Sequence, residues 1–240
     1  MAGHSHWKSI KRKKAVTDAR RGQVWSKLAR LIIIAAKRGA NPADNLALRY
    51  AIEKARAANM PNDTIDKAVK KGAGGAGATN FESVLYEGYG PGGAAILAEA
   101  LTDNRNRTAS EVRALFDRHG GALGSANSVG WLFSSQGLIA IERQAVEEDR
   151  LLELALEAGA VDVQTAPEGY TVQTALADFE KVRQALQAAK IPLASAELTM
   201  APRQSLSLTG ELGARVQGLI DALEENDDIQ NVYCNATWEE

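Results

Sequence analysis

The sequence contains a single cysteine, Cys234, in 240 residues. An internal disulfide bond needs two cysteines and a cysteine-rich metal site needs several, so the composition excludes both. A chain of this kind is typical of a reducing compartment, and we expect the cytoplasm. Cys234 is expected to serve as a small apolar side chain in a terminal strand.

Long apolar runs are also missing. The longest run, residues 31–36 (LIIIAA), is far shorter than the roughly 20 residues that cross a bilayer. The first residues, MAGHSHW, lack the hydrophobic segment of a secretory signal. We therefore expect neither a membrane segment nor a signal peptide.

Motifs of catalysis and of cofactor binding are absent too. There is no Gly-x-Ser-x-Gly, no P-loop lysine and no paired-carboxylate motif. His4 and His6 have the spacing of a metal pair, but a zinc site needs three or four ligands. The glycine-rich segment 72–78 follows an expected helix and precedes an expected strand, which is the reverse of a dinucleotide motif. We predict a flexible linker there, and a non-enzymatic protein without metal, cofactor or small-molecule substrate.

What the sequence does contain is charge separated along the chain. The first 72 residues hold 17 Lys and Arg against 5 Asp and Glu, although the whole chain has a net charge of −2. The remaining 168 residues therefore have a net charge of −14. A basic end on an acidic body favours a polyanionic partner, most often nucleic acid.

The apolar pattern predicts an α+β protein of three domains. Three helices are expected at about 18–39, 42–59 and 62–72, with Asn41 and Asn62 as N-caps. They form a basic helical nucleic-acid-binding domain, residues 1–79. Residues 137–202 predict strand-helix-strand-strand-helix-strand, the ferredoxin-like order. The flanking segments 80–136 and 203–240 are each half a unit, so we interpret them as one discontinuous middle domain that carries the ferredoxin-like domain as an insertion.

Several long motifs resemble one known family over the whole chain. At the N-terminus these are Ala2–Ser5 with Trp7, Arg21-Gly22, Asn59–Pro61 and Lys70–Gly72. In the middle they are Tyr86–Gly93, Thr102–Thr108 and Gly120–Gly124. In this order they are similar to the signatures of the YebC/PmpR family.

The resemblance implies a three-domain cytoplasmic protein with a helical N-terminal domain. Members of the family are described as DNA-binding transcriptional regulators. They are also described as translation factors that act on ribosomes, including at difficult proline-rich stretches, and mitochondrial relatives activate translation. Duplex DNA and ribosomal RNA, with the ribosome itself, therefore both stay open as partners; no membrane partner is expected.

The strongest candidate for binding is the basic N-terminal segment. Its cations can neutralise phosphates, and its tryptophan offers a face on which a base can stack. The alternative is a solvated basic tail. The candidate residues are Trp7, Lys8, Lys11, Arg12, Lys13, Lys14, Arg20, Arg21 and Lys27. No recognition helix with base-reading side chains is evident, which favours recognition of backbone and shape.

A second candidate is the segment Asp103–Thr108, which we expect to be a loop with Thr108 as the N-cap of the next helix. Arg105 and Arg107 carry guanidinium groups that suit phosphate or carboxylate. They either bind RNA or a protein partner, or pair with Asp103 and Glu111 and fix the loop. The glycines of 88–93 more often form only a tight turn than a binding site. The acidic residues of 147–157 and 224–228 either contact basic proteins or form a solvated face.

Overall fold

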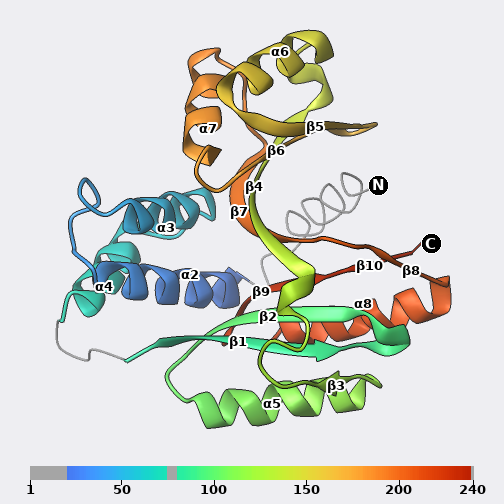
Figure 1. The fold of residues 1–240 in the computed structure, drawn as a ribbon. Coiled ribbons are helices and arrows are strands. Elements are labelled where there is room, and N and C mark those ends of the chain that lie inside the picture. The colour runs from blue at the N-terminus through green and yellow to red at the C-terminus, as the bar shows by residue number, and fades with distance from the viewer. Residues whose placement is uncertain (1–20, 75–79, 239–240) are drawn as a thin grey trace. The chain divides into compact units, whose positions relative to one another are not determined.

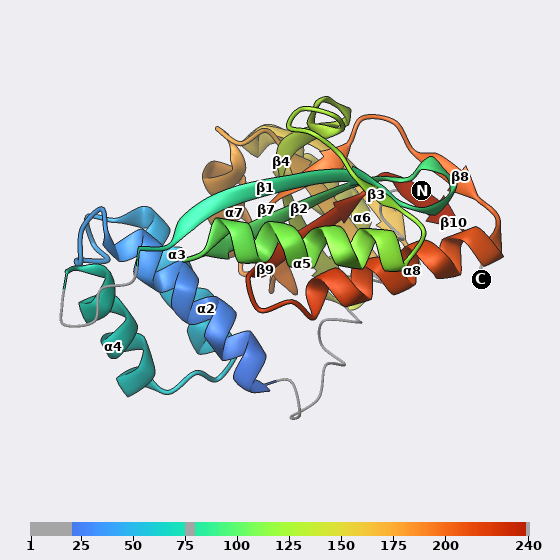
Figure 2. The same cartoon turned by 90° about the horizontal axis from the view of Figure 1, so that it is seen from below.

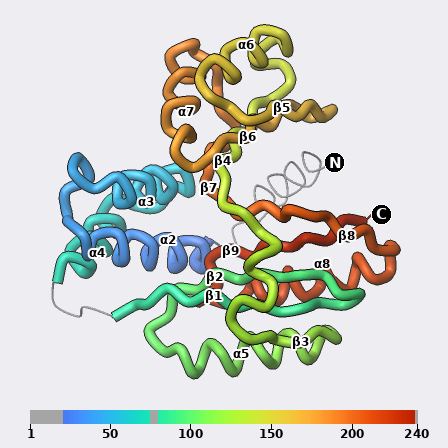
Figure 3. The backbone as a smooth tube through the Cα atoms, viewed as in Figure 1, coloured from blue at the N-terminus to red at the C-terminus, as the bar shows by residue number. Residues whose placement is uncertain are grey.

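The structure is a computed structural model, and it describes residues 21–74 and 80–238. These residues form two compact units (Figure 1). The smaller unit comprises residues 132–204, and the larger comprises the described residues before and after it. The chain therefore passes out of the larger unit after Trp131 and returns to it at Ser205, as the backbone trace shows (Figure 3).

Among the described residues, the larger unit begins with three helices, α2 (Arg21–Ala36), α3 (Leu46–Ala57) and α4 (Asn62–Gly72). Leucine, isoleucine and alanine at helical spacing give each helix one apolar face, and these faces form a common core. Ile32, Leu48 and Ile65 lie at its centre and are almost completely buried. A Cβ on Gly72 would lie 2.4 Å from the Ile33 carbonyl oxygen, so this glycine permits α4 to pack closely on α2.

The N-caps of two helices differ from those predicted. Asn45, and not Asn41, caps α3, because its side chain accepts a hydrogen bond from the Leu48 amide at 3.1 Å. Its amide group also donates to the carbonyls of Ala35 and Gly39, which fixes the connection to α2. Pro61 precedes α4, and Asn62 is already its first helical residue.

The middle of the larger unit is a four-stranded antiparallel sheet in the order β3-β1-β2-β9. Its strands are β1 (Glu82–Tyr89), β2 (Ala95–Thr102), β3 (Ala122–Leu123) and β9 (Ile229–Cys234). The glycines of 88–93 belong to a tight turn that joins β1 to β2 and contains the short helix η2 (Pro91–Gly93). A separate parallel pair is formed by β8 (Leu206–Leu208) and β10 (Ala236–Trp238).

Two helices, α5 (Arg105–Arg118) and α8 (Gly210–Glu224), lie side by side on one face of this sheet (Figure 2). Alternate residues of β1 and β2, such as Val84, Tyr86 and Ile96, point toward these helices. They pack on Phe116 of α5 and Leu219 of α8, which are fully buried. Because β9 completes the sheet beside β2, segments more than 100 residues apart in sequence share one core.

The smaller unit is a four-stranded antiparallel sheet in the order β5-β6-β4-β7. The short helices η3 (Gly130–Leu132) and η4 (Arg143–Ala145) flank its first strand. Its elements in chain order are β4 (Phe133–Glu142), α6 (Glu148–Ala158), β5 (Ala160–Ala166), β6 (Gly169–Thr174), α7 (Phe179–Ala188) and β7 (Ser195–Pro202). Ile139, Tyr170 and Val172 of the sheet pack on Leu151 of α6 and Leu186 of α7. This strand order and connectivity are those of a ferredoxin-like fold.

The predicted fold class is confirmed: the protein is α+β, with an N-terminal three-helix domain followed by two domains in which helices cover a sheet, one of them ferredoxin-like. The exact boundaries of the three domains stay a prediction. Below, the helical domain means residues 21–74, and the middle domain means residues 80–131 with 205–238.

Candidate nucleic-acid interface

The structure describes four of the predicted binding residues, and they lie at two places. Arg21 and Lys27 are on α2, and Arg105 and Arg107 are in the first turn of α5. Seven candidates lie outside the described residues: Trp7, Lys8, Lys11, Arg12, Lys13, Lys14 and Arg20. His4, His6 and most of the glycine-rich linker lie outside them as well.

The helical domain keeps a strong positive charge without the N-terminal segment. Its residues 21–74 include 11 Lys and Arg but only four Asp and Glu. Most of these cations are exposed, and sequence reasoning did not single them out, because they are spread over three helices instead of forming a run. The exposed ones beyond Arg21 are Lys37, Arg38, Arg49, Lys54, Arg56, Lys67 and Lys70.

Lys27 does not belong to this exposed set. With Gln23 and Arg30 it lies on one face of α2, at the spacing of one and two helical turns. Gln23 and Lys27 donate to backbone carbonyls at the C-terminal end of α8, and Arg30 donates to the Asp227 carbonyl in the turn that follows. The Lys27 amino group donates to the Glu224 carbonyl at 2.6 Å. The last carbonyls of a helix lack intrahelical partners and carry negative partial charge, so a cation is favourable there.

Burial changes the titration of this lysine. It lowers the pKa of Lys27 from 10.5 to about 8, although Glu224 and Asp227 act in the opposite direction. The side chain is thus held at the contact between α2 and α8.

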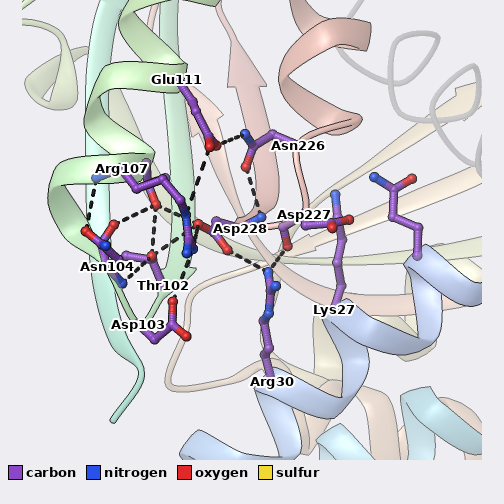
Figure 4. A network of polar contacts seen from close by, with 12 residues as sticks. Lys27, Arg30, Thr102, Asp103, Asn104, Arg107, Glu111, Asn226, Asp227 and Asp228 are labelled. Atoms are coloured by element: carbon purple, nitrogen blue, oxygen red, sulfur yellow. Dashed lines mark hydrogen bonds and ion pairs between the residues drawn. The ribbon is translucent and has the colours of Figure 1, made fainter. Parts of the chain in front are cut away.

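Asp228 is the centre of the polar network beside this contact (Figure 4). Its carboxylate is 4% exposed and accepts from four side chains. Oδ2 accepts from the hydroxyls of Thr108 at 2.6 Å and Thr102 at 3.1 Å, and from Arg107 at 2.7 Å. Oδ1 pairs with Arg30 of α2 at 2.9 Å. One buried carboxylate therefore joins the helical domain, the first turn of α5 and the start of β9.

The charge of Asp228 is stabilised by these partners. Burial alone would raise the pKa of its carboxyl group, but the hydrogen bonds from Thr108 and Arg107, together with Arg30, hold that pKa below its usual value. The group is therefore ionised at neutral pH and ties both arginines to it.

The prediction of a loop at Asp103–Thr108 is wrong in part. Helix α5 begins at Arg105, and its N-cap is Asn104, whose side chain accepts from the Arg107 amide at 3.1 Å. Thr108 is not the cap; it is fully buried, and its hydroxyl donates to Asp228. Asparagine and threonine both cap helices well, so the choice depends on the buried carboxylate that Thr108 reaches.

The two arginines of this segment have different surroundings. Arg107 pairs with Asp103 at 3.1 Å and with Asp228, and it approaches Glu111 at 4.0 Å, as the pairing alternative anticipated. The side chain of Arg105 is exposed, and no hydrogen bond or ion pair within the described part of the chain engages its guanidinium group. Its backbone carbonyl accepts from the Tyr86 hydroxyl at 3.3 Å. Arg105 is thus the more accessible of the two for a phosphate.

Other chemistry finds little support in the described residues. They contain no group of three or more His, Cys, Asp or Glu side chains placed to hold a metal ion. Over the same residues, no helix is both long and apolar enough to cross a membrane. Burial raises the pKa of the Cys234 thiol to about 11, so this thiol is not a reactive nucleophile at neutral pH.

Comparison with known proteins adds relatives that extend over the whole chain. A curated protein of Pelotomaculum thermopropionicum is 50% identical over 238 residues and one of Hahella chejuensis is 51% identical over 237 residues. The alignments cover 98% of this chain in both cases, and 98% and 95% of the relatives. Both relatives are named probable transcriptional regulatory protein.

A crystal structure of a conserved hypothetical protein from Aquifex aeolicus has the same fold. It superposes with a TM-score of 0.84 at 44% identity, over 93% of each chain. Two family models also match: the TACO1/YebC protein N-terminal domain at residues 5–75, and the TACO1/YebC second and third domain at residues 81–236. The chain belongs to the TACO1/YebC family.

Proposed function

We propose that the protein is a non-enzymatic, cytoplasmic regulator that binds nucleic acid, and that it regulates transcription as a DNA-binding protein. The observation that carries the proposal is the cation-rich helical domain of an otherwise acidic chain. The names of the relatives, probable transcriptional regulatory protein, support the regulatory role.

The proposed mode of binding is electrostatic. The exposed lysines and arginines of α3 and α4 neutralise backbone phosphates, and the basic segment before α2 adds further contacts. Each phosphate contact on duplex DNA makes the slope of log K against log salt concentration more negative by about 0.9. Such contacts position a protein on the helix without reading its sequence.

The experiment is a salt titration of binding to one labelled duplex DNA and to one structured RNA of equal length. We expect tight duplex binding whose slope becomes smaller when Lys8, Lys11 and Arg12 are changed together to alanine. A triple variant of the acidic residues Glu147, Asp149 and Glu153 to alanine is the control, and it should not weaken binding.

Binding that is unaffected by the basic substitutions would overturn the proposal. Sedimentation of cell lysates distinguishes a transcriptional regulator from a translation factor. Comigration with ribosomal particles that survives DNase would replace the transcriptional role by that of a translation factor. A fast fraction that DNase removes would support the transcriptional role.

A further inference from the structure

The arginines of the middle domain all lie on its two helices. The described residues of this domain contain five arginines and no lysine against twelve Asp and Glu. The arginines are Arg105, Arg107, Arg113 and Arg118 on α5 and Arg215 on α8. Cations are thus concentrated on the helical face of a domain with a net charge of −7.

Two of these arginines and a histidine line one open cleft. It has a volume of about 390 Å³ and lies where the C-terminal end of α5 meets α8. Arg118, His119 and Arg215 contribute the cationic or titratable side chains, and Asp117 contributes one carboxylate. Within residues 21–74 and 80–238, no ion pair or hydrogen bond engages the guanidinium group of Arg118 or Arg215.

The absence of a side chain at Gly120 lets Arg215 lie close to the end of α5, while the His119 ring lies at ordinary contact distance from Gly218 of α8. Gly120 has a φ of +75°, and a Cβ there would lie 2.5 Å from an Nη atom of Arg215. A Cβ on Gly218 would lie 3.7 Å from the edge of the His119 ring. Arg215 therefore lies against the end of α5, while His119 lies against α8.

Of the two ring nitrogens of His119, only Nδ1 has a hydrogen-bond partner among the described residues. Its Nδ1 is 2.8 Å from the Leu115 carbonyl oxygen, and a carbonyl can only accept, so Nδ1 carries a hydrogen. Nε2 then accepts a hydrogen bond in the neutral ring and donates one in the protonated ring. In the protonated form, this nitrogen and the two guanidinium groups provide donors for the oxygens of one tetrahedral anion.

Helix electrostatics explains only part of this cluster. Arg118 and His119 lie at the C-terminal end of α5, where a cation is favourable in itself. Arg215 lies within α8, where no such reason applies, and Asp117 offsets only one of the two arginine charges.

We propose that this cleft is a phosphate-binding site formed by Arg118, His119 and Arg215. The phosphate is a backbone phosphate of the nucleic acid that the helical domain binds, an assignment that rests on the proposed function. A free phosphate compound has the same chemistry, and the experiment distinguishes these two sources.

The test uses the full-length protein with inorganic phosphate at constant ionic strength. The imidazole resonances of His119 are followed by NMR and are identified with the His119→Gln variant. We expect phosphate to shift these resonances in the wild type. The shift should be lost when Arg118→Ala and Arg215→Ala are combined, and it should persist in Arg113→Ala. Arg113 is the matched control, since it removes the same charge from α5 but does not line the cleft.

The second arm measures binding of a short duplex DNA to the same variants. If the phosphate is part of the nucleic acid, the double variant loses about tenfold in affinity, as expected for charged hydrogen bonds. Its salt slope should also become smaller by about 1 to 2. A phosphate-dependent shift with unchanged DNA binding would keep the site and assign it to a free phosphate compound.

Two results are decisive against parts of this inference. If neither phosphate nor DNA shifts the His119 resonances while the wild type binds DNA with a steep salt slope, the cleft is not a phosphate site, and the proposed function stands. If the wild type does not bind nucleic acid at all, the proposed function fails, and the inorganic phosphate titration still decides the cleft.

Discussion

Asp228 is a buried, charged carboxylate that contacts four side chains from three elements. Burial of a carboxylate is costly unless charged and hydrogen-bonding partners replace the lost water. Here two hydroxyls and two guanidinium groups do so, and they come from α2, β2 and α5. Asp228 thus links the helical domain to the middle domain.

We predict that Asp228→Asn lowers the free energy of unfolding by about 2–4 kcal/mol, because it leaves Arg30 and Arg107 without their shared anion. Urea denaturation at pH 7 measures this. Asp227→Asn, a change at an exposed side chain next to it, is the control and should cost much less. Equal losses in the two variants would contradict a special role for Asp228.

The Asp228 carboxylate also makes the free energy of unfolding depend on pH in the acid range. Its folded pKa lies below the ordinary value of 3.8, so the unfolded state binds the proton more readily. The stabilisation is therefore complete above pH 3.8 and is lost as the pH falls through the folded pKa. We expect the difference in unfolding free energy between wild type and Asp228→Asn to shrink below about pH 4.

Lys27 makes the free energy of unfolding depend on pH in the alkaline range. Its folded pKa of about 8 is below its ordinary value of 10.5, so between these values the unfolded state binds more protons. Stability due to this group must then rise with pH over that window and be independent of pH below it. Lys27→Met should remove this rise, whereas Lys67→Met, at an exposed lysine of α4, should keep it. Denaturation at pH 7.5, 8.5 and 9.5 tests this, and parallel profiles for wild type and Lys27→Met would refute it.

At the scale of single residues, composition predicted which side chains carry charge but not what they contact. Arg105 and Arg107 were predicted together, and the structure separates them, because only Arg107 reaches Asp228. Arg30 was missed, since its partner lies about 200 residues away in the sequence. Such partners follow from tertiary structure, and no local pattern contains them.

At the scale of elements, apolar periodicity predicted the three N-terminal helices and the elements of 137–202, and the errors lie at the ends of elements. The strand-helix order of 137–202 follows from alternation and helical spacing, and the ferredoxin-like sheet confirms it. The caps of α3 and α5 were misplaced because neighbouring asparagines and threonines have similar capping preference. The pairing of β8 with β10 could not be predicted from segments this short.

Gly72 allows a test of helix packing against helix propensity. Alanine there would place its Cβ 2.4 Å from the Ile33 carbonyl oxygen, so α4 must move away from α2. We predict a loss of about 1–3 kcal/mol in unfolding free energy for Gly72→Ala. Gly22→Ala in α2 is the matched control: no atom lies within 4 Å of its Cβ, and alanine there should stabilise by up to about 1 kcal/mol. Thermal unfolding of both variants compares them, and stabilisation by both would show that the close approach is unimportant.

At the scale of the whole molecule, the positive charges of the helical domain serve two purposes. Lys27 and Arg30 of the helical domain bind the Glu224 carbonyl at the end of α8 and the Asp228 carboxylate, and these contacts join the helical domain to the middle domain. Other cations of the same domain, on α3 and α4, remain exposed. Positive charge in one small domain thus divides into a part that stabilises the protein and a part that is available to a polyanion.

This division predicts that stability and nucleic-acid binding can be changed separately. Lys67→Ala combined with Lys70→Ala should reduce the salt slope of DNA binding by up to about 2, one for each lost phosphate contact. The same pair of exposed substitutions should leave the unfolding free energy within about 0.5 kcal/mol. Lys27→Met should do the opposite at neutral pH, with altered stability and unchanged DNA affinity, because its amino group already faces α8. Filter binding and urea denaturation on the three proteins give both quantities. If Lys27→Met weakened DNA binding as much as the α4 variant, the face of α2 that holds α8 would have to be part of the DNA-binding surface, and the two domains would have to separate for DNA to bind.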